Sequence, residues 1–125
     1  MSEPPRADTA ADFLARIERE TVGGLQILLV LRIIAREKAV HGYALIRAMD
    51  DATGGRGLWK EGTIYPLLAH MEREGLVASQ WGDPASGPRR KYYHLTPAGR
   101  QALRLAILSW KDTRSAMDQL LEEKA

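Results

Sequence analysis

The sequence contains no cysteine, and it has no long apolar run. Without cysteine the chain cannot form disulfides, use a thiol in catalysis or bind a metal through thiolates, and the absence fits a reducing cytoplasm. The longest unbroken apolar stretch, residues 27–31, is far shorter than the roughly 20 residues that a membrane-spanning helix needs. We therefore expect a soluble protein with no membrane partner.

Residues 1–8 lack the basic and then apolar pattern of a signal sequence and instead carry two prolines and scattered charges. We expect them to form a disordered tail on an unprocessed, cytoplasmic protein. A strong net charge is absent as well: the formal charge is +2, although the pI of about 9.1 is a mild indication of a nucleic-acid partner. The 125 residues, of which 45% are hydrophobic, suffice for one compact domain plus an additional helix.

No catalytic or metal-binding constellation can be assembled from the sequence. The three histidines, His41, His70 and His94, lack the paired spacing of metal ligands. Three glycines within residues 54–57 suggest a phosphate loop, but the Gly-Lys-Ser/Thr ending is missing and no strand precedes them, so we interpret them as a connector. No nucleophile is paired with a base. We therefore predict no metal, no cofactor and no enzymatic activity.

The first half of the chain has helical periodicity. We expect a short helix over residues 9–20, a break at Gly23 and Gly24, and a helix over residues 25–37 that is apolar on nearly every side and forms the centre of the core. A third helix is expected over residues 43–52. Its predicted inward-facing residues are Leu45, Ile46, Met49 and Ala52.

The stretch 60–75 predicts a short amphipathic helix with a defined start and stop. Its apolar stripe, at spacings of three and four, consists of Ile64, Leu67, Leu68 and Met71. Trp59 is spaced to pack on Ile64 as a hydrophobic staple, and Gly75 fits a left-handed helix end. The outer face carries Thr63, Pro66, His70 and Arg73, with Lys60 ahead of it and Tyr65 at its border. Because this face is small, polar and basic, we interpret the helix as a reader of the DNA major groove.

Two strands, over residues 76–81 and 89–95, are expected to form a hairpin around a turn rich in proline and glycine. Alternation places Lys91, Tyr93 and Leu95 on the inner face of the second strand and Arg90, Tyr92 and His94 on the outer face. A cationic and aromatic strand beside such a turn fits a wing that contacts the phosphate backbone. A solvated run of charge is the alternative interpretation of Arg89, Arg90 and Lys91.

Thr96 and Pro97 predict the start of a long terminal helix. A helix of about 26 residues is roughly 39 Å long, so much of it must extend beyond a small domain. Its apolar seam consists of Leu103, Ala106, Trp110, Thr113, Met117 and Leu120. Because such a seam needs a partner, we expect residues 97–125 to form a dimerisation helix.

Three core helices, a hairpin and a long helix follow the order of a winged helix-turn-helix protein, mostly α with a small β-hairpin. On this interpretation residues 9–96 are the DNA-binding domain. Four runs, at residues 41–43, 62–68, 72–77 and 87–99, resemble those of the PadR family of transcriptional regulators. The resemblance covers about residues 24–110, and the short C-terminal region resembles the subgroup with a single dimerisation helix.

The resemblance implies a homodimeric repressor that binds double-stranded DNA and often responds to small aromatic or drug-like molecules. Carried over by position, the DNA-facing residues are Thr63, Tyr65 and Pro66 in the recognition helix and Arg89, Arg90 and Lys91 in the wing. On the outer face of the same strand, Tyr92 is a further predicted DNA contact. One departure from the family pattern is Lys60, where relatives often have a Ser or Asn helix cap. The lysine forfeits a cap worth about 1 kcal/mol and places a cation where a phosphate can pass.

Several assignments stay open at this point. Trp110 is either a residue of the dimer interface or, as the resemblance implies, one wall of a pocket between subunits for flat aromatic ligands, with Phe13 or Ile17 as a further wall. Tyr65 contacts a phosphate or closes the edge of the core, and Arg73 contacts DNA or favours the helix dipole. The alternative function is a winged-helix module that binds an acidic protein without binding DNA.

Overall fold

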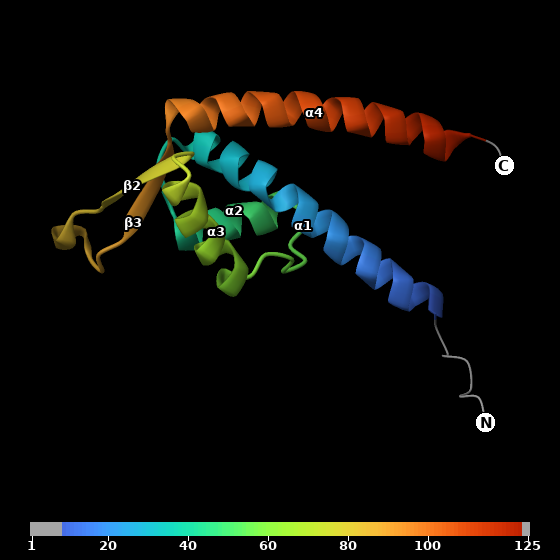
Figure 1. Cartoon of the computed structure of the whole chain (residues 1–125). Helices are drawn as coiled ribbons and strands as arrows, with labels where there is room; N and C mark the ends of the chain where they lie inside the picture. Colours follow the sequence, from blue (N-terminus) through green and yellow to red (C-terminus); the bar gives the residue numbers. More distant parts are fainter. Residues whose placement is uncertain (1–8, 124–125) are drawn as a thin grey trace.

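The computed structural model describes residues 9–123. The predicted disordered tail, residues 1–8, and the last two residues of the predicted dimerisation helix lie outside the described residues. In chain order the elements are α1 (Thr9–Glu37), β1 (Val40–His41), α2 (Gly42–Ala52), α3 (Glu61–Arg73), β2 (Val77–Trp81), a short 3-10 helix η1 (Pro84–Ser86), β3 (Lys91–Leu95) and α4 (Pro97–Glu122) (Figure 1). The prediction of a mostly helical fold with a small β-hairpin is confirmed.

The helix α1 is continuous from Thr9 to Glu37, so the predicted break at Gly23 and Gly24 is wrong. A Cβ at either glycine would meet nothing within 4 Å, and both positions lie on the open surface of the helix. Each glycine disfavours the helix by only about 1 kcal/mol relative to alanine. Packing of the C-terminal half of α1 supplies a nucleus from which the helix extends through both glycines.

The core lies between the C-terminal half of α1, the helices α2 and α3, and one face of the sheet. Its buried members include Ile34, Leu45, Met49, Ile64, Leu68, Met71, Val77 and Leu95, and Leu103 joins them from the start of α4. The predicted stripe of α3 is therefore confirmed, with Leu67 half-buried at its edge. Ala52 is exposed, contrary to expectation, because α2 ends at this residue.

The sheet has the order β1–β3–β2, and both pairings are antiparallel. The two-residue strand β1 is not predicted from the sequence, because two residues carry no periodicity. It brings His41 opposite Tyr92. The second hairpin strand starts at Lys91 rather than at the predicted Arg89. The predicted inner face is confirmed, since Tyr93 and Leu95 are buried.

The end of α3 and the start of α4, which flank the hairpin, have the structures that the sequence predicts. Gly75 has a φ of 78°, and the amide of Leu76 donates to the Met71 carbonyl at 3.0 Å, which closes α3 with a Schellman motif. The start of α3 carries no side-chain cap at Lys60, as expected from the sequence. At the start of α4 the amide of Gly99 donates to Thr96 Oγ1 at 3.0 Å.

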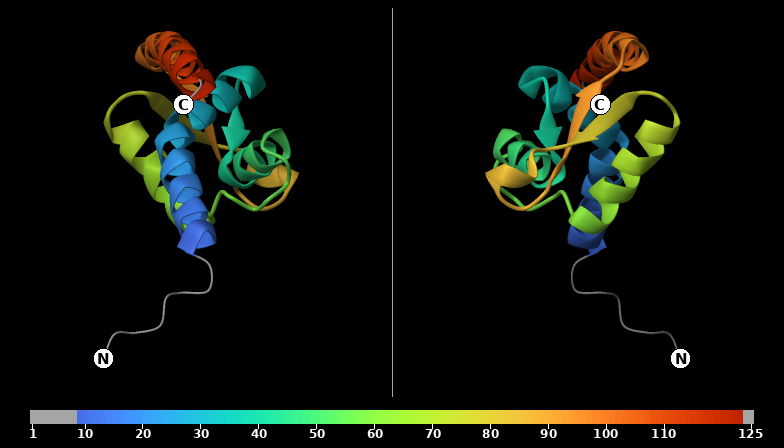
Figure 2. Two further views of the ribbon diagram at one scale, coloured as in Figure 1. Left: turned by 90° about the vertical axis from the view of Figure 1, so that its right-hand side faces the viewer. Right: turned by 90° about the vertical axis from the view of Figure 1, so that its left-hand side faces the viewer.

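The helices α1 and α4 pack together near the sheet and diverge away from it (Figures 1 and 2). The N-terminal part of α1 and the C-terminal part of α4 extend from the body on the side opposite the hairpin. Their exposed large apolar side chains are Phe13, Leu14 and Ile17 on α1, and Trp110, Met117, Leu120 and Leu121 on α4. Of the predicted seam, Leu103 is buried in the core of its own subunit, so the exposed part begins later along α4.

Candidate nucleic-acid interface

The outer face of α3 is open to solvent. Its predicted residues, Thr63, Pro66, His70 and Arg73, are all exposed. His70 Nε2 lies 2.6 Å from Glu74 Oε1, one helical turn further along the chain. The face therefore presents a hydroxyl, an apolar ring, an imidazole and a guanidinium in sequence along one helix.

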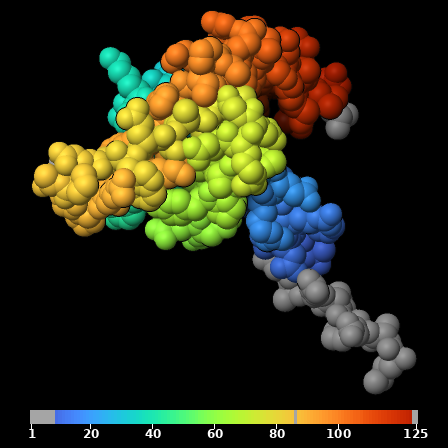
Figure 3. All heavy atoms as spheres, turned by 60° about the vertical axis from the view of Figure 1, so that its left-hand side comes forward, coloured from blue at the N-terminus to red at the C-terminus, as the bar shows by residue number. Residues whose placement is uncertain are grey.

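The hairpin protrudes from the body beside α3, so that the wing and the helix form one continuous surface (Figure 3). Three consecutive cations, which follow the turn of the hairpin, have three different partners. The Arg89 guanidinium lies 5.1 Å from the centre of the Trp81 ring, and Arg90 Nη1 lies 2.8 Å from His41 Nε2. Lys91 Nζ lies 3.1 Å from Glu72 Oε1. The run that looks uniform in the sequence therefore contains two exposed arginines and one half-buried, paired lysine.

Glu72 joins α3 to the hairpin. Its carboxylate accepts hydrogen bonds from the Ser79 hydroxyl and from Lys91. The Ser79 hydrogen bond and the Lys91 ammonium lower the pKa of Glu72, and the carboxylate in turn raises the pKa of Lys91. This position gives Lys91 a bonding partner inside the subunit, and its contact with DNA stays a prediction.

The Glu72 contacts predict a pH-dependent stability. Because the pKa of Glu72 is lowered from 4.5, its contribution is present above that value and is lost as the pH falls through the folded-state pKa. We expect the thermal midpoint to fall on acidification from about pH 6 to about pH 3, and to fall less in Glu72→Gln. Glu61→Gln, an exposed change in the first turn of α3, is the matched control. If the thermal midpoints of the wild type and Glu72→Gln fell equally on acidification, Glu72 would not be the source of this pH dependence.

Tyr65 packs over the start of α2. A Cβ added at Gly42 would collide with the Tyr65 ring, which explains why glycine follows His41. The Tyr65 side chain is nevertheless 41% exposed. Its ring therefore covers the start of α2 while its outer part stays open to solvent, and its contact with a phosphate stays a prediction.

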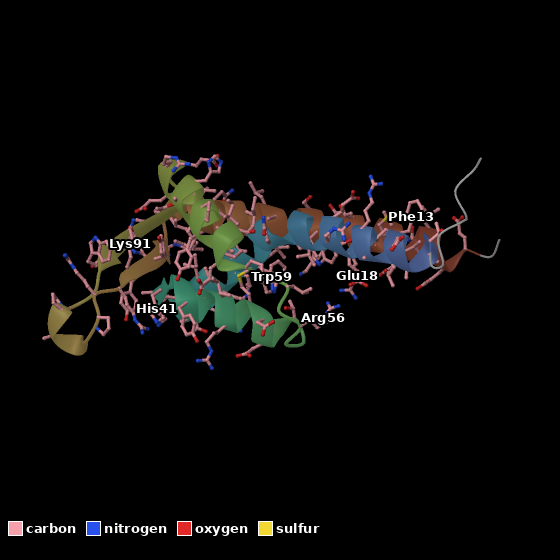
Figure 4. The ribbon with its side chains drawn as sticks, turned by 90° about the horizontal axis from the view of Figure 1, so that it is seen from below. Phe13, Glu18, His41, Arg56, Trp59 and Lys91 are labelled. Atoms are coloured by element: carbon pink, nitrogen blue, oxygen red, sulfur yellow. The ribbon has the colours of Figure 1, made fainter. Side chains whose placement is uncertain are left out.

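His41 is a residue that the sequence reasoning missed as part of this surface. Its Nδ1 accepts a hydrogen bond from the Ala44 amide at 3.2 Å and so caps α2, and its ring meets Tyr92 edge-on with centroids 5.5 Å apart. The only signal in the sequence was its place directly before Gly42, at the start of a helix. Figure 4 shows His41 and Lys91 at the hairpin end of the molecule, far along α1 from Phe13.

A family model described as the transcriptional regulator PadR-like family matches residues 30–105 of the chain. The chain belongs to this family. It is 33% identical over 95 residues to a transcriptional regulator of Mycobacterium tuberculosis, an alignment that spans 68% of this chain and 81% of the relative. The family resemblance predicted from the sequence is confirmed: the chain is a transcriptional regulator, and its family is not one of enzymes.

Two solved structures show the same architecture as this PadR-like regulator. A PadR family transcriptional regulator from Eggerthella lenta superposes with a TM-score of 0.82 at 30% identity, covering 94% of this chain and 100% of the other. A PadR-like transcriptional regulator from Bacillus cereus gives a TM-score of 0.74 at 30% identity, covering 84% and 99%. The likeness therefore includes the long terminal helix as well as the winged domain.

The residues predicted for a ligand pocket lie on the two diverging helices of the PadR-like regulator. Trp110 is 39% exposed on α4, and Phe13 and Ile17 are each 57% exposed on α1. A surface hollow of about 410 Å³ adjoins Phe13, and its other lining residues are Thr9, Asp12, Ala15, Arg16 and Arg19. Trp110 does not line this hollow, so a pocket shared by Phe13 and Trp110 would need a second subunit.

Within residues 9–123 of the regulator, no group of three or more His, Asp and Glu side chains is placed to hold a metal ion. Every helix there is too short or too polar to span a bilayer.

Proposed function

We propose that this PadR-like regulator binds double-stranded DNA as a homodimer, with α3 in the major groove and the hairpin on the adjacent backbone. The observation that carries the proposal is that the hairpin, with its exposed Arg89 and Arg90, lies beside α3, whose outer face is also exposed. The proposed DNA-contacting residues are Lys60, Thr63, Tyr65, Pro66, His70, Arg73, Arg89, Arg90, Lys91 and Tyr92.

Backbone and base contacts have different roles in this proposal. Arg89 and Arg90 neutralise phosphates and release counterions, which supplies affinity without regard to sequence. Thr63 and His70 carry donors and acceptors on the outer face of α3, where they reach base edges and supply sequence preference. Lys91 contributes less, because binding a phosphate would compete with its ion pair to Glu72.

The proposed dimer forms through α4, with the exposed Trp110, Met117 and Leu120 and the half-buried Ala106 in its seam. Exposed apolar area of this extent on two protruding helices is costly in water and is removed by pairing with a second copy. Two recognition helices on one face of DNA require half-sites about 34–36 Å apart. Such a dimer would repress a promoter in the cytoplasm by occupying the DNA that polymerase needs.

Binding to duplexes from a random-sequence library, followed by a salt titration of the selected duplex, tests the proposed function. The logarithm of the binding constant should fall linearly with the logarithm of salt concentration, by about 0.9 per neutralised phosphate. Arg90→Ala should weaken binding to every duplex by roughly tenfold and reduce the slope by about 0.9, because it removes one backbone contact.

The same library provides the matched comparison. Thr63→Ala and His70→Ala should change the selected sequence, whereas Arg90→Ala should not, since the arginine reads no base. Arg114→Ala, on the far part of α4, changes the net charge equally and should leave affinity unchanged. Failure of the wild type to bind any duplex would favour the alternative function, a module that binds an acidic protein.

We further propose that a flat aromatic ligand binds between the two subunits, against Trp110 and the α1 residues Phe13 and Ile17. A planar cationic dye should quench the fluorescence of the wild type. Trp110→Phe leaves Trp59 and Trp81 in place and should remove the quenching. Equal quenching in both proteins would place the dye elsewhere and leave Trp110 as a packing residue of the dimer.

A further inference from the structure

His41 makes two contacts that a neutral imidazole cannot satisfy together. Nδ1 is 3.2 Å from the Ala44 amide nitrogen, and Nε2 is 2.8 Å from Arg90 Nη1. An amide N–H and a guanidinium N–H only donate hydrogen bonds, so each contact requires a lone pair on the imidazole. Neutral histidine has one nitrogen with a free lone pair. One of the two contacts must therefore give way.

Of the two contacts, the one between His41 Nε2 and Arg90 is the one that is lost. The Ala44 amide is fixed in the first turn of α2, where its only acceptor shown by the structure is the His41 cap, and a lost cap destabilises the helix. Arg90 is an exposed side chain ahead of β3, free to turn towards solvent. His41 therefore keeps the cap through Nδ1 and carries its proton on Nε2. Burial and the neighbouring Arg90 charge lower the pKa of His41, so the ring is neutral at neutral pH.

With this tautomer, Nε2–H and the Arg90 guanidinium are two neighbouring donors, and neither residue offers an acceptor to the other. Both residues line a surface hollow of about 790 Å³ that runs along α2 between the end of α1 and the wing. The charged groups that line it are Arg36, Arg47 and Arg90 on the positive side and Glu37 and Asp51 on the negative side. Arg36 and Glu37 form an ion pair 3.1 Å apart, so their charges cancel. The two arginines Arg47 and Arg90 then outweigh Asp51, and the hollow has a net positive charge.

We propose that His41 and Arg90 together hold one oxygen of a DNA backbone phosphate, which makes the start of α2 a third contact beside α3 and the wing. A phosphate oxygen accepts from both donors at once and leaves the cap on Ala44 in place, so every group in the conflict is satisfied. The positive end of the α2 dipole adds to the attraction. This inference rests on the proposed DNA binding.

His41→Asn separates the two functions of the histidine. Asparagine is a favoured helix cap, so the thermal midpoint should stay close to that of the wild type. Its short side chain does not reach the position of Nε2, and affinity for the selected duplex should fall about tenfold. The salt slope should fall in His41→Asn as it does in Arg90→Ala, by at most about 0.9, because either change removes the hold of Arg90 on the shared phosphate.

A double-mutant cycle with Arg90→Ala tests whether the two residues share one phosphate. The losses in affinity should be less than additive, because either change alone disrupts the same contact. In a set of duplexes that each carry one neutral methylphosphonate, wild-type binding should weaken most at one backbone position, and that position should cease to matter in both variants. The control is His94→Asn, which makes the same substitution on β3, away from the proposed phosphate contact. It should not change the affinity for the duplex.

Nitrogen chemical shifts of the three histidines report the tautomer directly in the wild type. The proton of His41 should lie on Nε2 both with and without DNA, and its resonances should shift with duplex but not with inorganic phosphate alone. A proton on Nδ1, a shift with phosphate ion alone, additive losses, or wild-type affinity of His41→Asn would each overturn this inference. Any of these results alongside tight wild-type binding would leave the proposed function intact, whereas no duplex binding would overturn both.

Discussion

Replacing Gly99 by alanine should lower the free energy of unfolding by about 3 kcal/mol, the upper part of the range for overpacked sites. Gly99 lies in the first turn of α4, where this helix crosses the start of the hairpin. A Cβ there would collide with the carbonyl oxygen of Leu76 and would touch the Leu95 side chain at 3.4 Å. The Leu76 carbonyl is backbone and accepts from the Thr96 amide at 3.2 Å, so it cannot move without disturbing that contact. Chemical denaturation measures the change.

Gly24→Ala is the matched control for this prediction. The chemical change is the same, but a Cβ at Gly24 meets nothing within 4 Å and the residue lies inside a helix. Alanine there should raise the free energy of unfolding by about 1 kcal/mol through helix propensity alone. Opposite signs for the two variants are expected. If Gly99→Ala were as stable as the wild type, α4 would not be packed closely against the Leu76 carbonyl.

The double substitution Met117→Glu and Leu120→Glu should convert the proposed dimer to a monomer and weaken DNA binding by at least about a hundredfold. Both side chains are exposed within the subunit, at 45% and 59%, so the fold of one subunit does not need them. In a dimer they would be buried, and four carboxylates would face one another without partners. A monomer loses the effective concentration that links two half-sites, which is worth 10²–10⁴ in affinity.

Sedimentation at micromolar concentration and duplex titration measure the two effects. The control is Ser115→Glu with Gln119→Glu, which adds the same charge to the opposite, exposed face of α4. That variant should remain dimeric and should bind DNA with an affinity within a fewfold of the wild type. A dimeric Met117→Glu and Leu120→Glu protein would place the subunit contact outside the predicted seam.

Local patterns sufficed to predict those features that depend on neighbours in the sequence. The stripe through Ile64 and Met71, the left-handed Gly75 and the cap at Thr96 each follow from spacing or backbone preference within a few residues. The break predicted at Gly23 and Gly24 is wrong, because contacts outside this local stretch decide whether the helix continues. Propensity is a weak local term, and packing further along α1 outweighs it.

Contacts between residues that are far apart in the sequence could not be predicted from such local patterns. The contact of His41 with Arg90 joins residues 49 positions apart and depends on the two-residue strand β1. The partner of Lys91 depends on how the hairpin lies against α3. The sequence predicts that three cations follow one another, but only the strand register and the adjoining elements decide which of them is neutralised.

The length of α1 has a consequence for control of this regulator. Its 29 residues correspond to about 44 Å at 1.5 Å per residue, with the exposed apolar N-terminal part at one end and the proposed DNA-binding surface towards the other. A rigid helix of that length amplifies rotation: a tilt of about 5° at one end displaces the other by about 4 Å, close to the rise of one base pair, about 3.4 Å. In the proposed dimer, a ligand between the N-terminal ends of the two α1 helices would therefore need to change their angle only slightly to move the two α3 helices out of register with the turns of the duplex.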